Sequence, residues 1–513
     1  MTSARLPRWF EPRTIPGLIA QRAAESPQAL ALIVASPSGS VTKTFLQLFE
    51  EAQNVARGLK RWGVVPGDRV VWILDNSSAI EALTLYHGVM IAGAVNVPVN
   101  TRLVAREVDH IFERTAPALV VYRGDKSVIP SSAEAIQTGG DDWIDLINAN
   151  DVSAIEVTVR PDDQASILFT SGTTGSPRGV VHTQSSSLAA GIGWADAFRL
   201  GPRDVLQSPF PVFTGAGLHF IGLSALWAGA SNVIDGTDID ASLGHIAEYG
   251  TTVFVAVPSI YQYWLESPAL SSADLRSIRI LDYGGAAMPP EAIRRLRQVM
   301  PDVGLMQTYG LTEAGPGGLY LHEDYAMQKL GSIGNRGAGQ FTQFRVVDDV
   351  GNDVGPDEVG ELVLRGPSIM TGYLDDPEGT AAAFTSDGWL RSGDDVRLDS
   401  AGFVYFVDRR KDIIVRGGFN VASAEVEAAL LEHPSVLEVA VVGRPHVHLG
   451  EDVHAVVVLK LGFSVEPEEL VRHAEGLLAA FKVPRTIELR KEALPRNASG
   501  KVQKTVLRGE LWP

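Results

Sequence analysis

The sequence predicts an α/β protein of more than one domain, and three observations support this. Apolar segments with strand and helix patterns alternate along most of the chain, as they do in βαβ units. At 513 residues the chain is longer than one hydrophobic core supports. From Gln343 onward the apolar runs are shorter and alternate with polar residues, which indicates a β-rich subdomain.

The first part of the chain predicts a largely parallel sheet. Helical spacing of apolar residues predicts a helix over 45–62, which ends at Gly63. Strands are then expected at 68–74, 94–99 and 118–122, with helices between them at 78–92 and 107–114. Residues 124–163 carry more charge, Pro and Ser, so we expect a peripheral connection there.

The later part of the chain continues the alternation and then changes character. Strands are expected at 165–169, 180–181, 253–257 and 278–283, a buried helix at 217–230, and shorter strands at 344–347 and 360–364. The charged run 408–412 marks the expected domain boundary, although a solvated β-turn would have the same composition. Beyond it lies a helix, strand, strand, helix pattern, so we expect domains at 1–410 and 411–513.

Composition excludes several classes of function. The net charge of -17 disfavours nucleic acid or an anionic membrane as a main partner. The chain has no cysteine, which excludes disulfides, cysteine-ligated zinc and a cysteine nucleophile. The N-terminus lacks an apolar signal region, and the most apolar stretch, 217–230, is too short to span a bilayer. A cytoplasmic protein without an integral membrane segment is therefore expected.

The most informative motif is the loop from Thr170 to Gly179, TSGTTGSPRG, between two expected strands. It holds three glycines and five hydroxyl side chains, which can turn many N–H and O–H donors toward one anion. Arg178 adds a fixed positive charge. An ordinary polar turn has the same composition, and the loop is not the Walker pattern. The chemistry nevertheless favours phosphate binding.

A second motif, QTYGLTE, covers Gln307 to Glu313. The face of Tyr309 can stack on a planar base. Thr312 offers a hydroxyl to a phosphate, and Glu313 offers a carboxylate to a hard cation such as Mg²⁺. Taken singly these signals are weak, because a Tyr-Gly turn and a surface glutamate explain them equally.

Two further residues carry candidate chemistry. Asp394, in Leu390-Arg391-Ser392-Gly393-Asp394, is expected at a tight turn where it can accept hydrogen bonds from ribose hydroxyls. An Asx-turn between two strands is the alternative. Lys501 follows a Ser-Gly turn and is suited to neutralise charge that develops in phosphoryl-type chemistry. A solvent-exposed lysine is the alternative there.

In this order and spacing, the motifs make the chain resemble the adenylate-forming superfamily of acyl-CoA synthetases, aryl-CoA ligases, peptide-synthetase adenylation domains and firefly luciferase. The resemblance runs nearly from end to end and is strongest in the fatty-acid and aryl-CoA ligase branch. It implies an α/β fold: a large N-terminal domain of αβ sheets plus a β-rich subdomain, with a small mobile α+β C-terminal domain. The matching segments are Gly67–Val70, Ala92–Val95, Val97–Asn100, Thr170–Gly179, Gly284–Ala286, Tyr309–Glu313, Met370–Tyr373, Asp394, Arg409–Asp412, Gly417–Glu427 and Ser499–Lys501.

The resemblance implies a two-step ligase that uses ATP, Mg²⁺ and CoA. A carboxylate attacks the α-phosphorus of ATP, pyrophosphate leaves, and a thiol then displaces AMP from the acyl-adenylate. The catalytic residues would be Lys501, Thr312 and Glu313, with Glu313 also the metal ligand. The nucleotide-binding residues would be Thr170, Ser171, Gly172, Thr173, Thr174, Gly175, Arg178, Gly284, Gly285, Ala286, Tyr309, Asp394 and Arg409.

The resemblance also assigns an acyl pocket, a thiol channel and a hinge. Lys411 would be the hinge about which the C-terminal domain turns after adenylation, and this turn would bring Gly417 and Gly418 to the CoA channel. The acyl pocket would be lined by Phe213, Thr214, Gly215, His219, Val257, Gly310 and Ala314. Most of these are small or apolar and none is Lys or Arg, which favours a bulky apolar acid over a dicarboxylate. His219 is interpreted either as a polar contact or as a structural histidine.

Three positions depart from the family's usual pattern. Arg178 stands where lysine is common in the phosphate loop, Thr214 where histidine is usual beside the acyl pocket, and Ser423 where proline is usual. These departures put efficient adenylation in doubt. A ligase specialised for the thioesterification half-reaction therefore remains an alternative, as do an enzyme that loads a carrier protein, a luciferase-type oxygenase and a nucleotide sensor. A homodimer is also left open.

Overall fold

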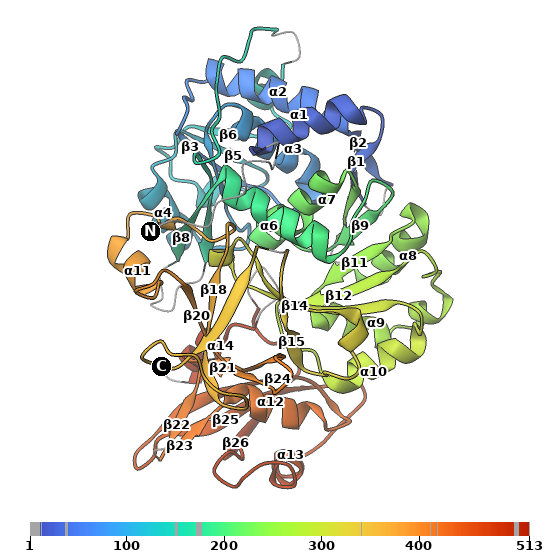
Figure 1. Cartoon of the computed structure of the whole chain (residues 1–513), viewed down its shortest axis with the longest axis vertical. Coiled ribbons are helices and arrows are strands. Elements are labelled where there is room, and N and C mark those ends of the chain that lie inside the picture. The colour runs from blue at the N-terminus through green and yellow to red at the C-terminus, as the bar shows by residue number, and fades with distance from the viewer. Residues whose placement is uncertain are drawn as a thin grey trace.

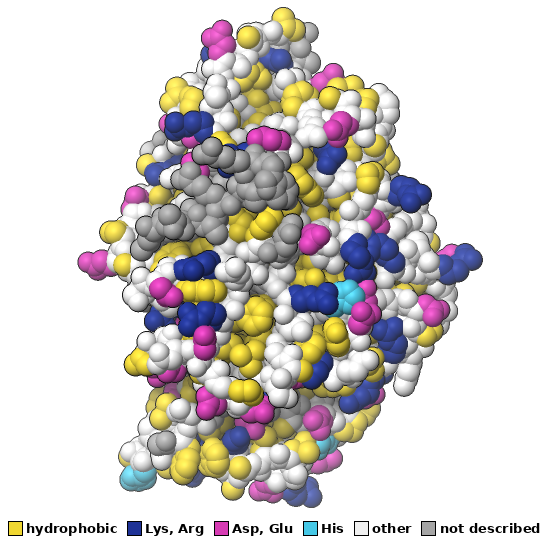
Figure 2. Space-filling model, viewed as in Figure 1, with side chains coloured by type: hydrophobic (Ala, Val, Ile, Leu, Met, Phe, Trp, Pro, Cys, Tyr) yellow, Lys and Arg dark blue, Asp and Glu magenta, His cyan; other side chains and the backbone are white. Residues whose placement is uncertain are grey.

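Two lobes make up the computed structural model, which describes residues 11, 13–35, 39–148, 152–170, 177–236, 238–339, 341–410, 412–417, 419–496 and 502–511. The large lobe contains three sheets, and the C-terminal lobe contains the fourth, drawn orange to red at the bottom of Figure 1. On the face shown in Figure 2, acidic and basic side chains are interspersed over the surface. Among the described residues on that face, Lys and Arg side chains lie next to Asp and Glu side chains in several places.

The first sheet of the large lobe carries the two strands that flank the 170–179 loop. Its order is β19-β8-β7-β4-β3-β5-β6, and strands β3 to β7 run parallel while β8 and β19 are antiparallel. Its strands are β3 (Arg69–Ile73), β4 (Val95–Pro98), β5 (Leu119–Tyr122), β6 (Ala135–Gln137), β7 (Gln164–Thr170), β8 (Arg178–Thr183) and β19 (Gly372–Tyr373).

The second sheet carries the strands that end at Gly284 and Gly310. Its order is β16-β14-β13-β12-β11-β9-β10-β1-β2, with a parallel centre from β13 to β1 and antiparallel strands at both edges. Its strands are β1 (Leu30–Val34), β2 (Val41–Thr44), β9 (Val205–Ser208), β10 (Ser231–Ile234), β11 (Val253–Ala256), β12 (Ile280–Gly284), β13 (Gly304–Gly310), β14 (Gly318–Leu321) and β16 (Arg336–Gly337).

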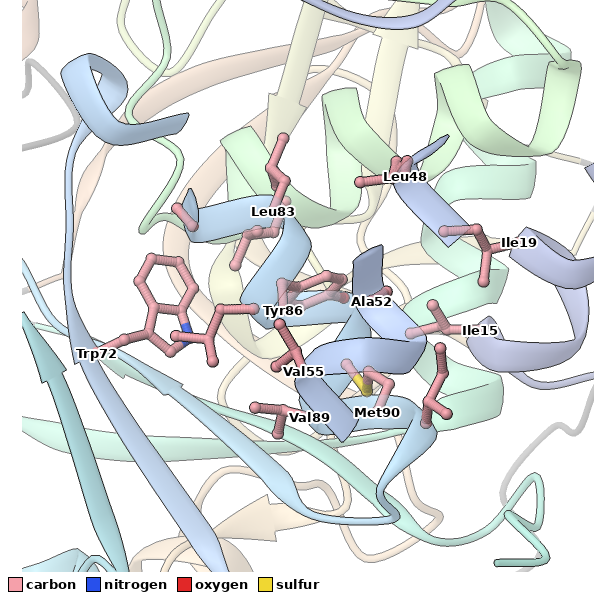
Figure 3. Packing of buried hydrophobic residues seen from close by; sticks show 14 of the residues in the cluster. Ile15, Ile19, Leu48, Ala52, Val55, Trp72, Leu83, Tyr86, Val89 and Met90 are labelled. Atoms are coloured by element: carbon pink, nitrogen blue, oxygen red, sulfur yellow. The ribbon is translucent and has the colours of Figure 1, made fainter. Parts of the chain in front are cut away.

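A buried core joins these two sheets through the helices between them. Helix α2 (Phe45–Arg61) begins at a capping box in which Thr44 and Gln47 bond each other's backbone N–H groups, which satisfies donors that the first turn leaves unpaired. Its apolar face packs on α3 (Ala79–Ile91), where Tyr86 and Met90 meet Trp72 of β3 and Ile15 of α1 (Ile15–Glu25) (Figure 3). The predicted alternation therefore produces a layered α/β body.

The remaining helices of the large lobe cover the sheets and include one π-helix, η3. They are η1 (Asn76–Ser78), α4 (Ala105–Thr115), η2 (Lys126–Val128), α5 (Asp141–Leu146), α6 (Gln184–Ala197), η3 (Ala216–Gly222), α7 (Leu223–Ala228), α8 (Ile239–Tyr249), α9 (Pro258–Glu266), η4 (Pro268–Ser272), α10 (Pro290–Val299), η5 (Thr312–Ala314), η6 (Glu323–Tyr325) and α11 (Pro377–Ala382).

The β-rich subdomain is an antiparallel sheet of order β15-β21-β20-β18-β17. Its strands are β15 (Ser332–Gly334), β17 (Gln343–Val347), β18 (Val359–Arg365), β20 (Leu390–Leu398) and β21 (Val404–Arg409). The C-terminal lobe follows with the sheet order β23-β22-β25-β24, and β26 adds to β25. Its elements are β22 (Ile414–Arg416), β23 (Phe419–Val421), α12 (Ser423–Leu431), β24 (Val436–His446), β25 (Gly450–Leu459), α13 (Pro467–Glu475), β26 (Thr486–Arg490) and α14 (Lys504–Leu511).

The predicted α/β architecture with a β-rich subdomain and a small C-terminal lobe is confirmed, with two local corrections. Residues 124–163 are not only a connection, because β6 extends the first sheet and α5 packs on α2. Asp394 lies inside the continuous strand β20 instead of at a turn between strands. Gly393 with a φ of 72° and a register shift at Asp395 bend this strand, which is how a turn-like sequence fits within it.

Candidate active site

The centre of the site joins β13 to the β-rich subdomain. The Tyr309 hydroxyl donates to Asp394 Oδ2 at 2.5 Å, and Arg409 Nε lies 3.5 Å from Asp394 Oδ1. Asp394 and Arg409 face each other across the β20–β21 ladder. Burial first and the Asp394 charge second raise the pKa of Tyr309 well above its usual value. Tyr309 therefore contacts the Asp394–Arg409 pair, and all three are residues that the resemblance assigns to the nucleotide.

Two glycines at the end of β12 are required for different reasons, Gly284 by packing and Gly285 by its backbone conformation. Gly284 pairs with Thr308 across β12 and β13, and a Cβ at this position would lie 2.3 Å from the Thr308 hydroxyl. Gly285 has a φ of 79°, a conformation that residues with a Cβ rarely adopt. Gly285 and Ala286 are exposed. These two exposed residues follow the end of β12, and β12 lies beside the strand that carries Tyr309.

The base of the phosphate loop lies on β7 and β8. Thr170 and Arg178 are cross-strand partners there, whereas Ser171, Gly172, Thr173, Thr174 and Gly175 lie outside the described residues. The Arg178 guanidinium stacks 4.0 Å above the Tyr373 ring, and the Tyr373 hydroxyl donates to Glu313 Oε1 at 3.0 Å. Tyr373 thus joins the expected phosphate cation to the expected metal ligand.

Sequence reasoning assigned no role to Tyr373. Burial and the nearby Glu313 carboxylate raise the pKa of its hydroxyl, so it stays a hydrogen-bond donor at neutral pH. The only available signal was its place in the Met370–Tyr373 motif, which does not reveal what its side chain touches.

Two buried histidines hold the turn that contains Thr312 and Glu313. A carbonyl oxygen only accepts, so His182 Nε2 donates to Thr312 O at 2.8 Å and His219 Nδ1 donates to Gly315 O at 3.2 Å. His219 Nε2 then accepts from the Ser166 hydroxyl at 3.1 Å. The two rings meet edge to face with centroids 5.5 Å apart. The described contacts favour the structural reading of His219, and His182 is a residue that the sequence analysis missed.

Both histidines are neutral in this environment. Burial lowers the pKa of His182 to about 4, against the hydrogen bond to Thr312 that raises it. Burial and the neighbouring His182 lower the pKa of His219 to about 3. The turn that bears Glu313 is therefore supported by two uncharged donors, which add no positive charge to this turn.

A pH-dependent loss of stability follows from these shifts. The unfolded chain takes up protons on both histidines below about pH 6.5 whereas the folded chain does not until about pH 4, so the free energy of unfolding falls as the pH drops through this window. We expect a loss of about 2 kcal/mol per histidine between pH 7.5 and 5. Urea unfolding of wild type and of His182→Gln/His219→Gln at both pH values checks this. Equal losses in the two proteins would contradict it.

Two of the expected acyl-pocket residues, Thr214 and Gly215, lie at the start of helix η3. The Thr214 hydroxyl donates to Pro211 O at 2.7 Å and accepts from Gly217 N at 3.0 Å, so this departure from the usual histidine bonds the backbone on both sides of it. A Cβ on Gly215 would lie 3.7 Å from Pro316, and one on Gly310 would lie 2.4 Å from Pro316 O. Pro316 therefore lies close to both glycines.

Three other acyl-pocket candidates, Phe213, Ala314 and Val257, lie on other parts of the large lobe. Phe213 is buried in the core cluster that also holds Leu168. Ala314 is buried on η5 next to Tyr309. Val257 immediately precedes α9. No charged side chain is among these three.

The C-terminal candidates are only partly described. Gly417 has a φ of 57° and donates its N–H to Leu449 O at 2.8 Å, whereas Lys411, Gly418 and Lys501 lie outside the described residues. Arg496 and Val502 form a bridge at the base of the loop that bears Lys501.

Glu438 connects Arg496, at the base of this loop, to the large lobe. Glu438 pairs with Arg496 at 3.2 Å and also accepts from Tyr263 of α9 at 3.5 Å. Tyr263 belongs to the large lobe and Glu438 to the C-terminal lobe. Arg496, the last described residue before Lys501, therefore lies where the two lobes meet.

Comparison with known proteins identifies the family. The profile of the AMP-binding enzyme family matches residues 19–374, and that of the AMP-binding enzyme C-terminal domain matches residues 425–501. The chain belongs to the AMP-binding enzyme family. The first match takes in the phosphate loop, Tyr309, Glu313 and Tyr373, and the second ends at Lys501.

Two similar proteins are CoA ligases, and the similarity covers nearly the whole length of both chains. A long-chain-fatty-acid–CoA ligase of Mycobacterium tuberculosis is 34% identical, with 97% of this chain and 98% of the relative covered. A feruloyl-CoA synthase of an Amycolatopsis species is 33% identical, with 95% and 97% covered. The chain is accordingly an ATP-dependent, AMP-forming acyl-CoA ligase of the adenylate-forming superfamily.

Solved structures share the fold. The ATP-bound MatB from Rhodopseudomonas palustris superposes with a TM-score of 0.86 at 30% identity, covering 96% of this chain and 98% of that one. The apo form of the same protein gives 0.76 at 29% identity and the same coverage. Within the residues described here, no helix has the length and apolarity needed to cross a membrane.

Proposed function

We propose that this ligase converts a bulky apolar carboxylic acid to its CoA thioester. The observation that carries the proposal is the lack of a positive charge in the acyl-pocket segments. They contain small and apolar residues and no Lys or Arg, and His219, whose pKa is lowered to about 3, is neutral. A second carboxylate on the acid would be buried without a partner there, which is costly. A medium or long fatty acid, a ring carboxylate or a terpenoid acid would instead fill the space with apolar surface.

In this proposal the nucleotide lies between the Gly284–Ala286 edge and the phosphate loop. Tyr309 stacks on adenine, while Asp394 and Arg409 hold the ribose from the β20–β21 ladder. Arg178 and the loop donors neutralise the outer phosphates, and the Thr312 hydroxyl donates to the α-phosphate. Lys501 bridges the substrate carboxylate and the α-phosphate, which aligns the nucleophile with the phosphorus and offsets the developing charge.

Mg²⁺ fits this site as a partner of the nucleotide. Among the described residues, no three His, Asp or Glu side chains gather as a metal cage. A magnesium ion held by one carboxylate plus substrate phosphates needs no such cage. Glu313, whose Oε1 is fixed by the Tyr373 hydroxyl, would hold it, and the bound ion would supply charge neutralisation at the phosphates.

CoA would enter after a rotation of the C-terminal domain. We place the domains at 1–410 and 411–513, with Lys411 as the hinge. Gly417 takes a left-handed φ at the tip of the β22–β23 hairpin, and this hairpin, with Gly418, would border the pantetheine channel. Because the reaction consumes ATP and CoA, a cytoplasmic site of action is part of the proposal.

A panel of acids tests the substrate class. Medium and long fatty acids, cyclohexane carboxylates, cinnamic acids and malonate are each supplied with ATP, Mg²⁺ and CoA, and AMP and the thioester are measured by mass spectrometry. We expect kcat/KM for the best apolar acid to exceed that for malonate by about 100-fold or more, because the pocket cannot pair a second carboxylate. A preference for malonate would overturn the proposal.

A further inference from the structure

The two lobes are joined at the start of helix α12 by a buried carboxylate. Both the backbone N–H and the hydroxyl of Ser423 donate to Asp408 Oδ2, at 2.5 and 2.7 Å. Asp408 lies on β21 and pairs with Asp395 of β20, so it belongs to the large lobe. Ser423 is the first residue of α12 in the C-terminal lobe. Asp408 and Ser423 are 2% and 0% exposed, so water does not compete for these bonds.

The C-terminal helix completes the contact. Lys504 Nζ donates to Ser423 Oγ at 2.6 Å and pairs with Glu427 Oε1 at 2.7 Å. Glu427 also accepts from the N–H of Val441 on β24. Asp408, Ser423, Lys504 and Glu427 therefore form one polar chain, which we call the lobe latch. It ties the helix that begins three residues after Lys501 to the large lobe.

The identity of residue 423 decides whether this latch exists. Proline, usual at this position in the resemblance, fits the first turn of a helix but has neither an N–H nor a hydroxyl. Both bonds to Asp408 and the acceptor for Lys504 would then be lost. The negative charge of Asp408 is also favourably placed at the N-terminus of α12. The serine of this chain thus adds contacts between the lobes that a proline cannot make.

We propose that Ser423 is a positioning residue that holds the C-terminal lobe in the orientation seen here, with the base of the Lys501 loop against α9. The inference rests on the proposed function, in which this orientation serves adenylation and rotation of the lobe serves thioester formation. A tighter latch favours the first half-reaction, and a weaker latch favours the second. Ser423 touches no substrate and acts only through the balance of the two orientations.

Distance measurement tests the latch without using activity. The chain has no cysteine, so Val299→Cys on α10 and Leu461→Cys on the C-terminal lobe give unique, exposed sites for nitroxide labels. We expect one dominant distance in the otherwise wild-type protein. Ser423→Pro should add a second population, since the bonds that fix the lobe are gone. An unchanged distribution would overturn the proposal, whether or not the enzyme ligates any acid.

The two half-reactions give the functional readout. ATP–pyrophosphate exchange reports adenylation, and thioester formation from a supplied acyl-adenylate and CoA reports the second step. We expect Ser423→Pro to lower the ratio of adenylation to thioester formation about tenfold, since bonds to a buried carboxylate are lost. Ser423→Ala, which keeps the N–H, should have a smaller effect, and Ser423→Thr should preserve the ratio.

A matched serine separates positioning from stability. Ser435 is 1% exposed and its hydroxyl bonds His433 Nδ1 at 2.7 Å, within the C-terminal lobe. Ser435→Ala should lower stability comparably but leave both the ratio and the distance distribution unchanged. If Ser423→Pro lowers both half-reactions equally, so that their ratio stays unchanged, the latch has only a structural role. If neither half-reaction occurs in wild type, the proposed function fails and the distances alone decide the latch.

Discussion

Lys501→Ala is expected to lower acid-dependent ATP–pyrophosphate exchange by about 100- to 1000-fold. In the proposed function this ammonium group offsets the charge that develops between the carboxylate and the α-phosphate, and alanine leaves that charge without a partner. Thioester formation from a supplied acyl-adenylate should stay within about threefold of wild type, because the lysine is withdrawn in that step. Single-turnover assays of each half-reaction measure the difference.

The control for Lys501→Ala is Lys491→Ala. Lys491 is exposed in the same lobe, ten residues earlier, and its loss changes the net charge equally. It should leave both half-reactions unchanged. Exchange that survives in Lys501→Ala would remove the lysine from the adenylation step, and an equal loss of both half-reactions would show that the variant disturbs the lobe as a whole.

Local sequence patterns were enough to predict the layered body. The long segments, such as α2 and β3, follow helical or strand periodicity and were predicted within one or two residues. The strand β6 and the helix α5 were missed because each is too short to show a period. Asp394 was misplaced at a turn because Ser-Gly-Asp has turn composition, whereas the partners β18 and β21 extend the strand through it.

The candidate site could be predicted only as a set of separate motifs. Tyr309 and Asp394 were chosen from their own neighbourhoods, and the 2.5 Å bond between them joins residues that are 85 positions apart. His182 and Tyr373 gave no local signal, because their roles depend on partners more than 50 positions away. Such contacts are set by the packing of the sheets, which a single sequence does not display.

Each of the three residues that depart from the usual family pattern makes a specific contact in the structure. The planar guanidinium of Arg178 stacks on Tyr373, which the ammonium of a lysine would do less well. The Thr214 hydroxyl accepts from the Gly217 N–H in the first turn of η3, and Ser423 binds Asp408. These contacts show that the fold accommodates each of the three substitutions.

Glu313→Gln is expected to lower adenylation about 100-fold and to raise the Mg²⁺ concentration needed for half-maximal exchange. Glutamine keeps the shape of the side chain, and its amide oxygen can still accept from the Tyr373 hydroxyl that now bonds Glu313 Oε1 at 3.0 Å. Only the negative charge is lost, and with it the carboxylate that a hard cation prefers. Titration of exchange activity with Mg²⁺ measures both effects.

Two variants show whether the metal or the surrounding contacts cause the loss. Tyr373→Phe removes the hydroxyl that fixes Glu313 but retains the ring beneath Arg178, so we expect a loss of about threefold to tenfold with a smaller shift in Mg²⁺ dependence. Glu378→Gln changes an exposed carboxylate on α11 and should change neither. If Glu313→Gln needs no more Mg²⁺ than wild type, Glu313 supports the turn held by His182 and His219 and does not bind the metal.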